Sequence, residues 1–214
     1  MPAMTDRIQT LGEEIANAAS HGVALVAAIA TMPFLIIAAS QRHPAAVVGA
    51  AVFGATMVLL YVCSTLYHAL PQGRGKRVFL VLDHSAIYLF IAGSYTPFAL
   101  GALSGPWGWS LFGVVWALAA AGVALKAFQR LSQPWLSTGL YLAMGWLVLV
   151  AAVPLMERMP EAGLWWLLAG GLAYTVGVVF FVLDQRMRYA HAVWHGFVAA
   201  GTGLHVVAVM GYAG

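Results

Sequence analysis

Long apolar runs alternate with short polar connectors along the whole chain. The runs cover residues 17–40, 45–70, 78–101, 107–128, 135–156, 163–183 and 190–212. Each run is long enough to cross a membrane as a helix, because a span needs about 20 apolar residues. The connectors are polar, and all except the last contain glycine or proline, which interrupt helices. The pattern predicts an all-α membrane protein, a bundle of seven transmembrane helices over residues 17–214, after a short N-terminal segment at residues 1–16.

Composition supports the membrane class and narrows the possible chemistry. Hydrophobic residues make up 62% of the chain and charged residues only 8%, which leaves too little polar surface for a soluble domain. The first residues include Asp6 and Arg7 and form no apolar run, so we expect no cleavable signal peptide. The single cysteine, Cys63, lies inside an apolar run, which excludes a disulfide framework and a cysteine-rich metal site.

Lysine and arginine are distributed unevenly over the connectors. If the N-terminus is cytoplasmic, eight of the ten face the cytoplasm, namely Arg7, Arg74, Lys76, Arg77, Lys126, Arg130, Arg186 and Arg188. Only Arg42 and Arg158 then face the other side. Because positively charged loops are retained in the cytoplasm during insertion, the N-terminus is predicted to be cytoplasmic and the C-terminus extracytoplasmic.

Some residues inside the spans have a packing interpretation. Pro33, Pro97 and Pro154 fall within the apolar runs, where we expect kinks that neighbouring helices support. The polar residues at 94–96 precede Pro97 and are expected to pack against it.

Four metal-capable side chains fall at one depth of the predicted bundle. His68 lies near the end of the second span and Asp83 near the start of the third, while His191 and His195 begin the seventh. All four positions therefore lie on the cytoplasmic side, with Asp83 about 8–10 Å deep at a rise of 1.5 Å per residue. His191 and His195 are four residues apart, so their side chains project from one helix face.

Three imidazoles with an open fourth position form the ligand set of a catalytic zinc site. We therefore predict that His68, His191 and His195 bind zinc. Asp83 would either ligate the ion or hold its bound water, and Ser64 would orient His68 or contact the substrate. A polar packing network and a proton relay are the alternatives, although ionisable groups within a membrane are costly and point to function.

Further polar residues surround this layer. Glu14, Asn17 and Ser20 are spaced by three residues at the start of the first span, and His21 follows. They either line a cavity shared with the histidines, or they cap the N-terminus of the helix and form a polar seam along it. His205 lies about 15 Å deeper than His195 and either extends a relay or is a structural histidine.

These motifs resemble those of the hemolysin III family, bacterial relatives of the progestin and adiponectin receptors and, more distantly, of the alkaline ceramidases. The matching motifs, in order over nearly the entire chain, are Glu14-x-x-Asn17-x-x-Ser20-His21, Ser64-x-x-x-His68, Leu82-Asp83-His84-Ser85, Gly93-Ser94-Tyr95-x-Pro97, and His191-x-x-x-His195 with His205.

The resemblance implies seven spans with the N-terminus inside and a zinc ion near the cytoplasmic face. His68, His191 and His195 would be the ligands, Asp83 would hold the zinc-bound water, and Ser64 would line the site. His84 stands where the related receptors typically have tyrosine. This sequence shows no counterpart of the receptors' long N-terminal domain, so we do not expect hormone reception in their manner. The expected location is the bacterial inner membrane.

Three functions fit such a site. The first is a zinc-dependent hydrolase of a lipid amide or ester, with Asp83 as general base and a cavity between helices for an acyl chain. The second is a sensor or regulator of membrane lipids, in which zinc is structural and Asp83 is a fourth ligand. The third is a pore-forming cytolytic protein, as the family name suggests, although a secreted pore former needs a soluble state that this composition forbids. The expected partner is a membrane lipid or fatty-acyl substrate, with no nucleic acid.

Overall fold

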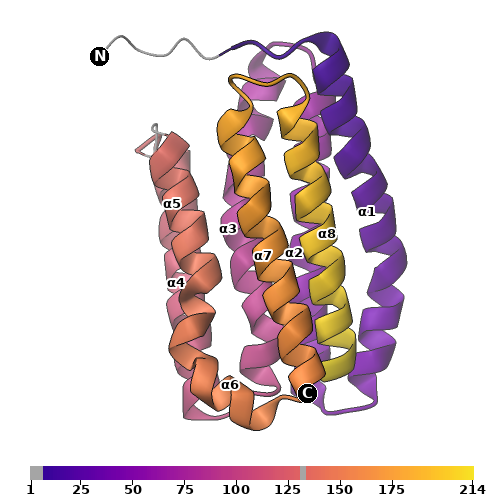
Figure 1. Cartoon of the computed structure of the whole chain (residues 1–214), viewed down its shortest axis with the longest axis vertical. Helices are drawn as coiled ribbons and strands as arrows, with labels where there is room; N and C mark the ends of the chain where they lie inside the picture. The colour runs from indigo at the N-terminus through magenta and orange to yellow at the C-terminus, as the bar shows by residue number, and fades with distance from the viewer. Residues whose placement is uncertain (1–6, 131–133) are drawn as a thin grey trace.

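The computed structural model describes residues 7–130 and 134–214, and all regular elements among them are helices. Residues 1–6 of the predicted N-terminal segment and 131–133 of the connector before the fifth span lie outside the described residues. The elements, shown in Figure 1, are α1 (Leu11–Ser40), α2 (Pro44–Ala69), α3 (Arg74–Leu100), α4 (Pro106–Ala127), α5 (Pro134–Gly145), a 3₁₀ helix η1 (Trp146–Ala151), α6 (Ala152–Arg158), α7 (Glu161–Leu183) and α8 (Ala190–Tyr212).

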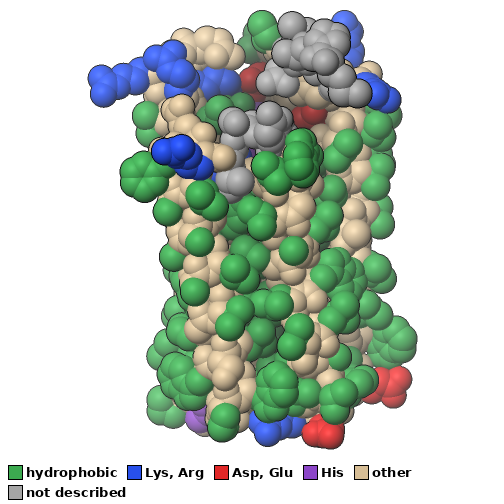
Figure 2. Space-filling model, turned by 90° about the vertical axis from the view of Figure 1, so that its left-hand side faces the viewer, with side chains coloured by type: hydrophobic (Ala, Val, Ile, Leu, Met, Phe, Trp, Pro, Cys, Tyr) green, Lys and Arg blue, Asp and Glu red, His purple; other side chains and the backbone are tan. Residues whose placement is uncertain are grey.

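The described residues form seven helical spans, which confirms the predicted all-α membrane fold. Six spans are single helices, and α5, η1 and α6 together make the fifth, over Trp135–Arg158. Helix α1 begins at one end of the bundle, and the C-terminus lies at the other end (Figure 1). On the face shown in Figure 2, apolar side chains cover the middle, and Lys and Arg gather mainly at the end where α1 begins. We call this the N-terminal end; its cytoplasmic location stays a prediction.

The first helix begins at Leu11, before the predicted span start at residue 17. The cause is a capping box, in which Thr10 and Glu13 each satisfy a backbone N–H of the other. The helix therefore extends past the apolar run, and its first turns bring Glu14 and Asn17 into the bundle.

The fifth span is interrupted where α5 changes to the 3₁₀ helix η1. The Tyr95 hydroxyl of α3 lies 2.8 and 2.7 Å from the carbonyl oxygens of Met144 and Gly145, and it accepts a hydrogen bond from Val148 N at 2.8 Å. Backbone groups within a membrane must find partners inside the protein. Tyr95 was predicted only to pack. Its hydroxyl instead provides hydrogen-bond partners for the backbone groups that are free where the helix breaks.

Helix α7 packs closely on α8 through a row of glycines. Its buried residues are Gly163, Gly170 and Gly177, spaced by seven. A Cβ at Gly170 would collide with the imidazole of His205, and one at Gly177 would approach Trp194 to 2.7 Å. Small residues allow such contact between membrane helices. The pair fixes the start of α8, where His191 and His195 lie.

Candidate metal centre

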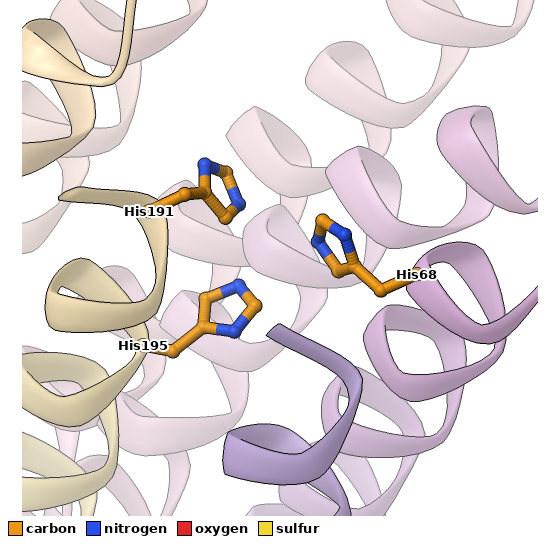
Figure 3. A group of neighbouring side chains, drawn as sticks. All are labelled: His68, His191 and His195. Atoms are coloured by element: carbon orange, nitrogen blue, oxygen red, sulfur yellow. The ribbon is translucent and has the colours of Figure 1, made fainter. Parts of the chain in front are cut away.

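Three histidines from two helices meet at the N-terminal end of the bundle. His68 comes from the last turn of α2, and His191 and His195 come from the first turns of α8. One ring nitrogen of each lies within 4.8 Å of the others, and Figure 3 shows the three imidazoles pointing toward one another. His68 and His195 are buried, and His191 is half-buried. The convergence predicted from helix rise is therefore present.

The imidazole of His68 is held through its Nδ1 atom. The Oε2 atom of Glu14 lies 2.7 Å from this nitrogen, while Oε1 of the same carboxylate forms an ion pair of 2.8 Å with Lys76. Lys76 is itself buried and donates to the backbone oxygens of Tyr67 and Leu70, at 3.0 and 3.3 Å. Glu14 is thus fixed by two partners and orients the ring of His68.

The two histidines of α8 are held in the same way. Asp184, the residue after α7, places Oδ2 3.0 Å from Nδ1 of His191. Nδ1 of His195 lies 3.0 Å from the Ser20 hydroxyl and 3.2 Å from the backbone oxygen of Asn17, both on α1. Metal-binding histidines commonly engage their second ring nitrogen with a carboxylate or carbonyl in this manner.

The Nε2 atoms are consequently the nitrogens left to face the centre of the cluster. Nε2 of His68 is buried and has no hydrogen-bond partner among the described residues. A buried polar atom without a partner is rare and calls for an explanation such as an ion. Neutral imidazole nitrogens are common ligands of zinc, and three of them form the ligand set of catalytic zinc sites. The residues present therefore fit a zinc ion.

Asp83 and Ser64 lie beside the cluster without belonging to it. Asp83 is buried and interacts with the Ser64 hydroxyl. That hydroxyl also lies 2.7 Å from Nδ1 of His21, whose ring stacks on His195 at a centroid distance of 3.5 Å. Among the described residues, the group of possible ligand atoms within 4.8 Å contains His68, His191 and His195 but not Asp83.

The remaining predicted residues divide into two groups. Glu14, Asn17, Ser20 and His21 all contact histidines of the cluster or Ser64, as described above. His205 lies elsewhere: its Nε2 is 3.3 Å from the backbone oxygen of Leu167, and its ring packs edge-on against Tyr174. It lines the same cavity as the histidine cluster, but no described contact joins it to them.

Two residues of the centre were not among the predicted site residues. Asp184 lies in the polar connector between the sixth and seventh predicted spans, and Lys76 entered the prediction only as a positive charge. An acidic residue at the end of one span, a short turn away from a ligand pair on the next, is a signal that could have identified Asp184. Lys76 offered no such signal, because lysine is common at the ends of membrane spans.

A large cavity adjoins the cluster. It has a volume of about 1650 Å³ and extends between α3, α5 and α7. Its lining includes Asp83 and the three histidines, and also Trp165 near the start of α7. Its wall is mainly apolar side chains, such as those of Phe90 and Leu168. The cluster thus faces a space suited to an apolar ligand.

Comparison with known proteins identifies the family. The family model described as "Haemolysin-III related" matches residues 9–206, almost the whole chain. The chain belongs to this family. It is 44% identical to "Hemolysin-3" of Bacillus cereus over 98% of its length and 95% of the relative's. It is 41% identical to "Hemolysin-3 homolog" of Bacillus subtilis, with 95% of each chain covered.

The chain also resembles animal proteins at lower identity. The human "Monocyte to macrophage differentiation factor" is 29% identical over 95% of this chain and 85% of the relative. No solved structure matches the chain. As a haemolysin-III-related protein with seven apolar helices, the chain is a multi-pass integral membrane protein, and its bacterial relatives fit a plasma-membrane location.

Proposed function

We propose that this haemolysin-III-related protein is a zinc-dependent hydrolase that cleaves a lipid amide or ester within the membrane. The observation that carries the proposal is the orientation of the three histidines. Each has its Nδ1 atom held by a neighbour, which leaves Nε2 to face a common centre beside an apolar cavity.

Zinc in this centre supplies Lewis acidity, which polarises a carbonyl group and makes water a stronger nucleophile. Asp83 would accept the proton of the attacking water at its carboxylate, because it lines the same cavity as the three histidines and lies outside the ligand group. The Ser64 hydroxyl would orient that carboxylate. The cavity would take the acyl chain and exclude bulk water from the reacting carbonyl.

A second function, a lipid sensor with structural zinc, is supported by a different observation. The cluster links α2 to α8, which are distant in sequence. Its hydrogen-bond partners Glu14 and Ser20 also connect it to α1. In this role zinc would stabilise the bundle without turnover.

The test measures metal and product in the same preparation. Purified, zinc-loaded protein is incubated with a panel of ceramides and phospholipids, and released fatty acid is quantified. If the protein is a hydrolase, the wild type releases fatty acid. The Asp83→Asn variant still binds zinc but releases none. Bound zinc without product from any lipid would favour the structural role, and equal zinc content in wild type and His68→Ala would exclude the metal site.

The names of the Bacillus relatives point to haemolysis. Leakage from liposomes, measured alongside, separates this activity from hydrolysis. Leakage that survives His68→Ala would show that a cytolytic activity of this chain does not depend on the histidine centre.

A further inference from the structure

Residues Arg7–Thr10, which we call the N-terminal strap, cross the N-terminal end of the bundle ahead of α1. In Figure 1 this segment passes over the connector between α7 and α8. The backbone N–H of Arg7 donates to Oε1 of Gln185 at 2.7 Å, and its Nη2 donates to the backbone oxygen of Asp184 at 2.9 Å. The strap therefore contacts a segment about 180 residues away in the sequence.

Glu13 joins the strap to the start of α8. Its carboxylate receives two hydrogen bonds from the Arg7 guanidinium, at 2.9 and 2.7 Å. It also accepts a bond from the backbone N–H of Tyr189 at 3.0 Å. The side chain of Glu13 is only 2% exposed, and a buried carboxylate is tolerated when it is paired and fully hydrogen-bonded.

Tyr189 is the residue from which α8 starts, and its backbone is strained. It has a φ of 60°, in the left-handed region that residues other than glycine seldom occupy. Such a conformation persists only when the surrounding contacts hold it. The hydrogen bond to Glu13 is one of these contacts, and His191 follows two residues later.

The strapped connector carries the residue that orients a metal ligand. Asp184, held at its backbone oxygen by Arg7, holds Nδ1 of His191 with its side chain. The other two ligands are fixed from α1 and do not use the connector: His68 by Glu14, and His195 by the hydroxyl of Ser20.

We propose that Arg7 and Glu13 are positioning residues for the metal centre: the N-terminal strap holds the α7–α8 connector so that His191 stays in place as a ligand. The inference rests on the zinc site of the proposed function. Release of the strap frees His191 while His68 and His195 keep their partners, so the centre then exchanges its metal faster. Metal retention is thereby coupled to the N-terminus of the chain.

The experiment measures the rate at which zinc leaves the purified full-length protein for an excess of chelator. Arg7→Ala should release zinc about tenfold faster, and Asp184→Asn about 10–100-fold faster, if the 10–100-fold loss of affinity that follows mutation of the partners of ligand histidines is expressed in the release rate. Arg7→Lys keeps the charge but loses the two-pronged contact with Glu13, so its rate should fall between those of wild type and Arg7→Ala.

Arg42→Ala is the matched control. Arg42 donates to the backbone oxygens of Val209 and Met210, at 3.2 and 2.6 Å, at the other end of α8. Arg42→Ala should lower the melting temperature, as Arg7→Ala does. Unlike Arg7→Ala, it should leave the rate of zinc release unchanged. If Arg7→Ala does not fold, Gln185→Ala removes a single strap contact and takes its place.

Two failures are distinguishable. Wild-type protein that binds no zinc overturns the metal site itself. Wild-type protein that holds zinc, with equal release rates in Arg7→Ala and Arg42→Ala, overturns the strap and leaves the metal site intact.

Discussion

Glu14 serves two partners at the metal centre, and its removal should affect both. Glu14→Gln keeps the shape but weakens the bond to His68 Nδ1 and leaves the buried Lys76 ammonium without its carboxylate. We expect zinc affinity to fall about tenfold or more and the free energy of unfolding to fall by about 1–3 kcal/mol. Competition with a chelator and denaturant unfolding measure the two effects. Glu157→Gln, at an exposed position, should change neither.

The convergence of the three histidines was predictable at this scale because helix rise and the alternating direction of the spans determine the depth of each residue. His68, His191 and His195 lie at one level in any seven-span arrangement with these boundaries. The partners Asp184 and Lys76 were not predictable in the same way, because their role depends on where a side chain points across a turn. The place of Asp83 beside the cluster likewise depends on side-chain positions, because direct and water-mediated coordination require the same residue.

Among the elements, the interruption of the fifth span has its backbone groups hydrogen-bonded by a single side chain, the phenol of Tyr95. Tyr95→Phe removes the partner of Val148 N and of the carbonyl oxygens of Met144 and Gly145. Unpaired backbone groups are costly at membrane depth, so we expect a loss of about 1–3 kcal/mol in unfolding free energy. Zinc content, measured on the same sample, should stay at the wild-type value, because Tyr95 does not contact the histidine cluster. A variant as stable as wild type would show that the break needs no partner from α3.

The glycine row of α7 allows a comparison between adjacent positions. Gly170→Ala places a methyl group against His205, whereas the nearest side-chain atom to a Cβ at Gly171 belongs to Trp146, at 3.8 Å. We expect Gly170→Ala to destabilise the protein by about 1–3 kcal/mol through overpacking, and Gly171→Ala to be neutral or stabilising because alanine favours helix. Thermal unfolding of the two variants measures the difference. Equal melting temperatures would contradict a close approach of α7 and α8 at Gly170.

The elements themselves were predictable, because hydropathy defines spans of about 20 residues well. The ends of α2, α4 and α8 lie within one residue of the predicted runs. The start of α1 differs because the capping box of Thr10 and Glu13 acts through hydrogen bonds rather than hydropathy. The break at Gly145 differs because the hydroxyl that bonds its free backbone groups belongs to Tyr95, on another helix.

For the whole molecule, the charge distribution predicts which end of the bundle faces the cytoplasm. Eight of ten Lys and Arg residues belong to the N-terminal end if the spans alternate as the structure shows, and such residues are retained inside during insertion. The metal centre would then open to the cytoplasm.

Site-directed labelling tests this orientation. In a background with Cys63→Ala, single cysteines are introduced at Arg188 in the α7–α8 connector and at Glu157 at the other end, both exposed. A membrane-impermeant thiol reagent added to intact cells should label the position at 157 and should label the position at 188 only after lysis. The reverse pattern would place the histidine centre on the outer side, where zinc and substrate would come from outside the cell.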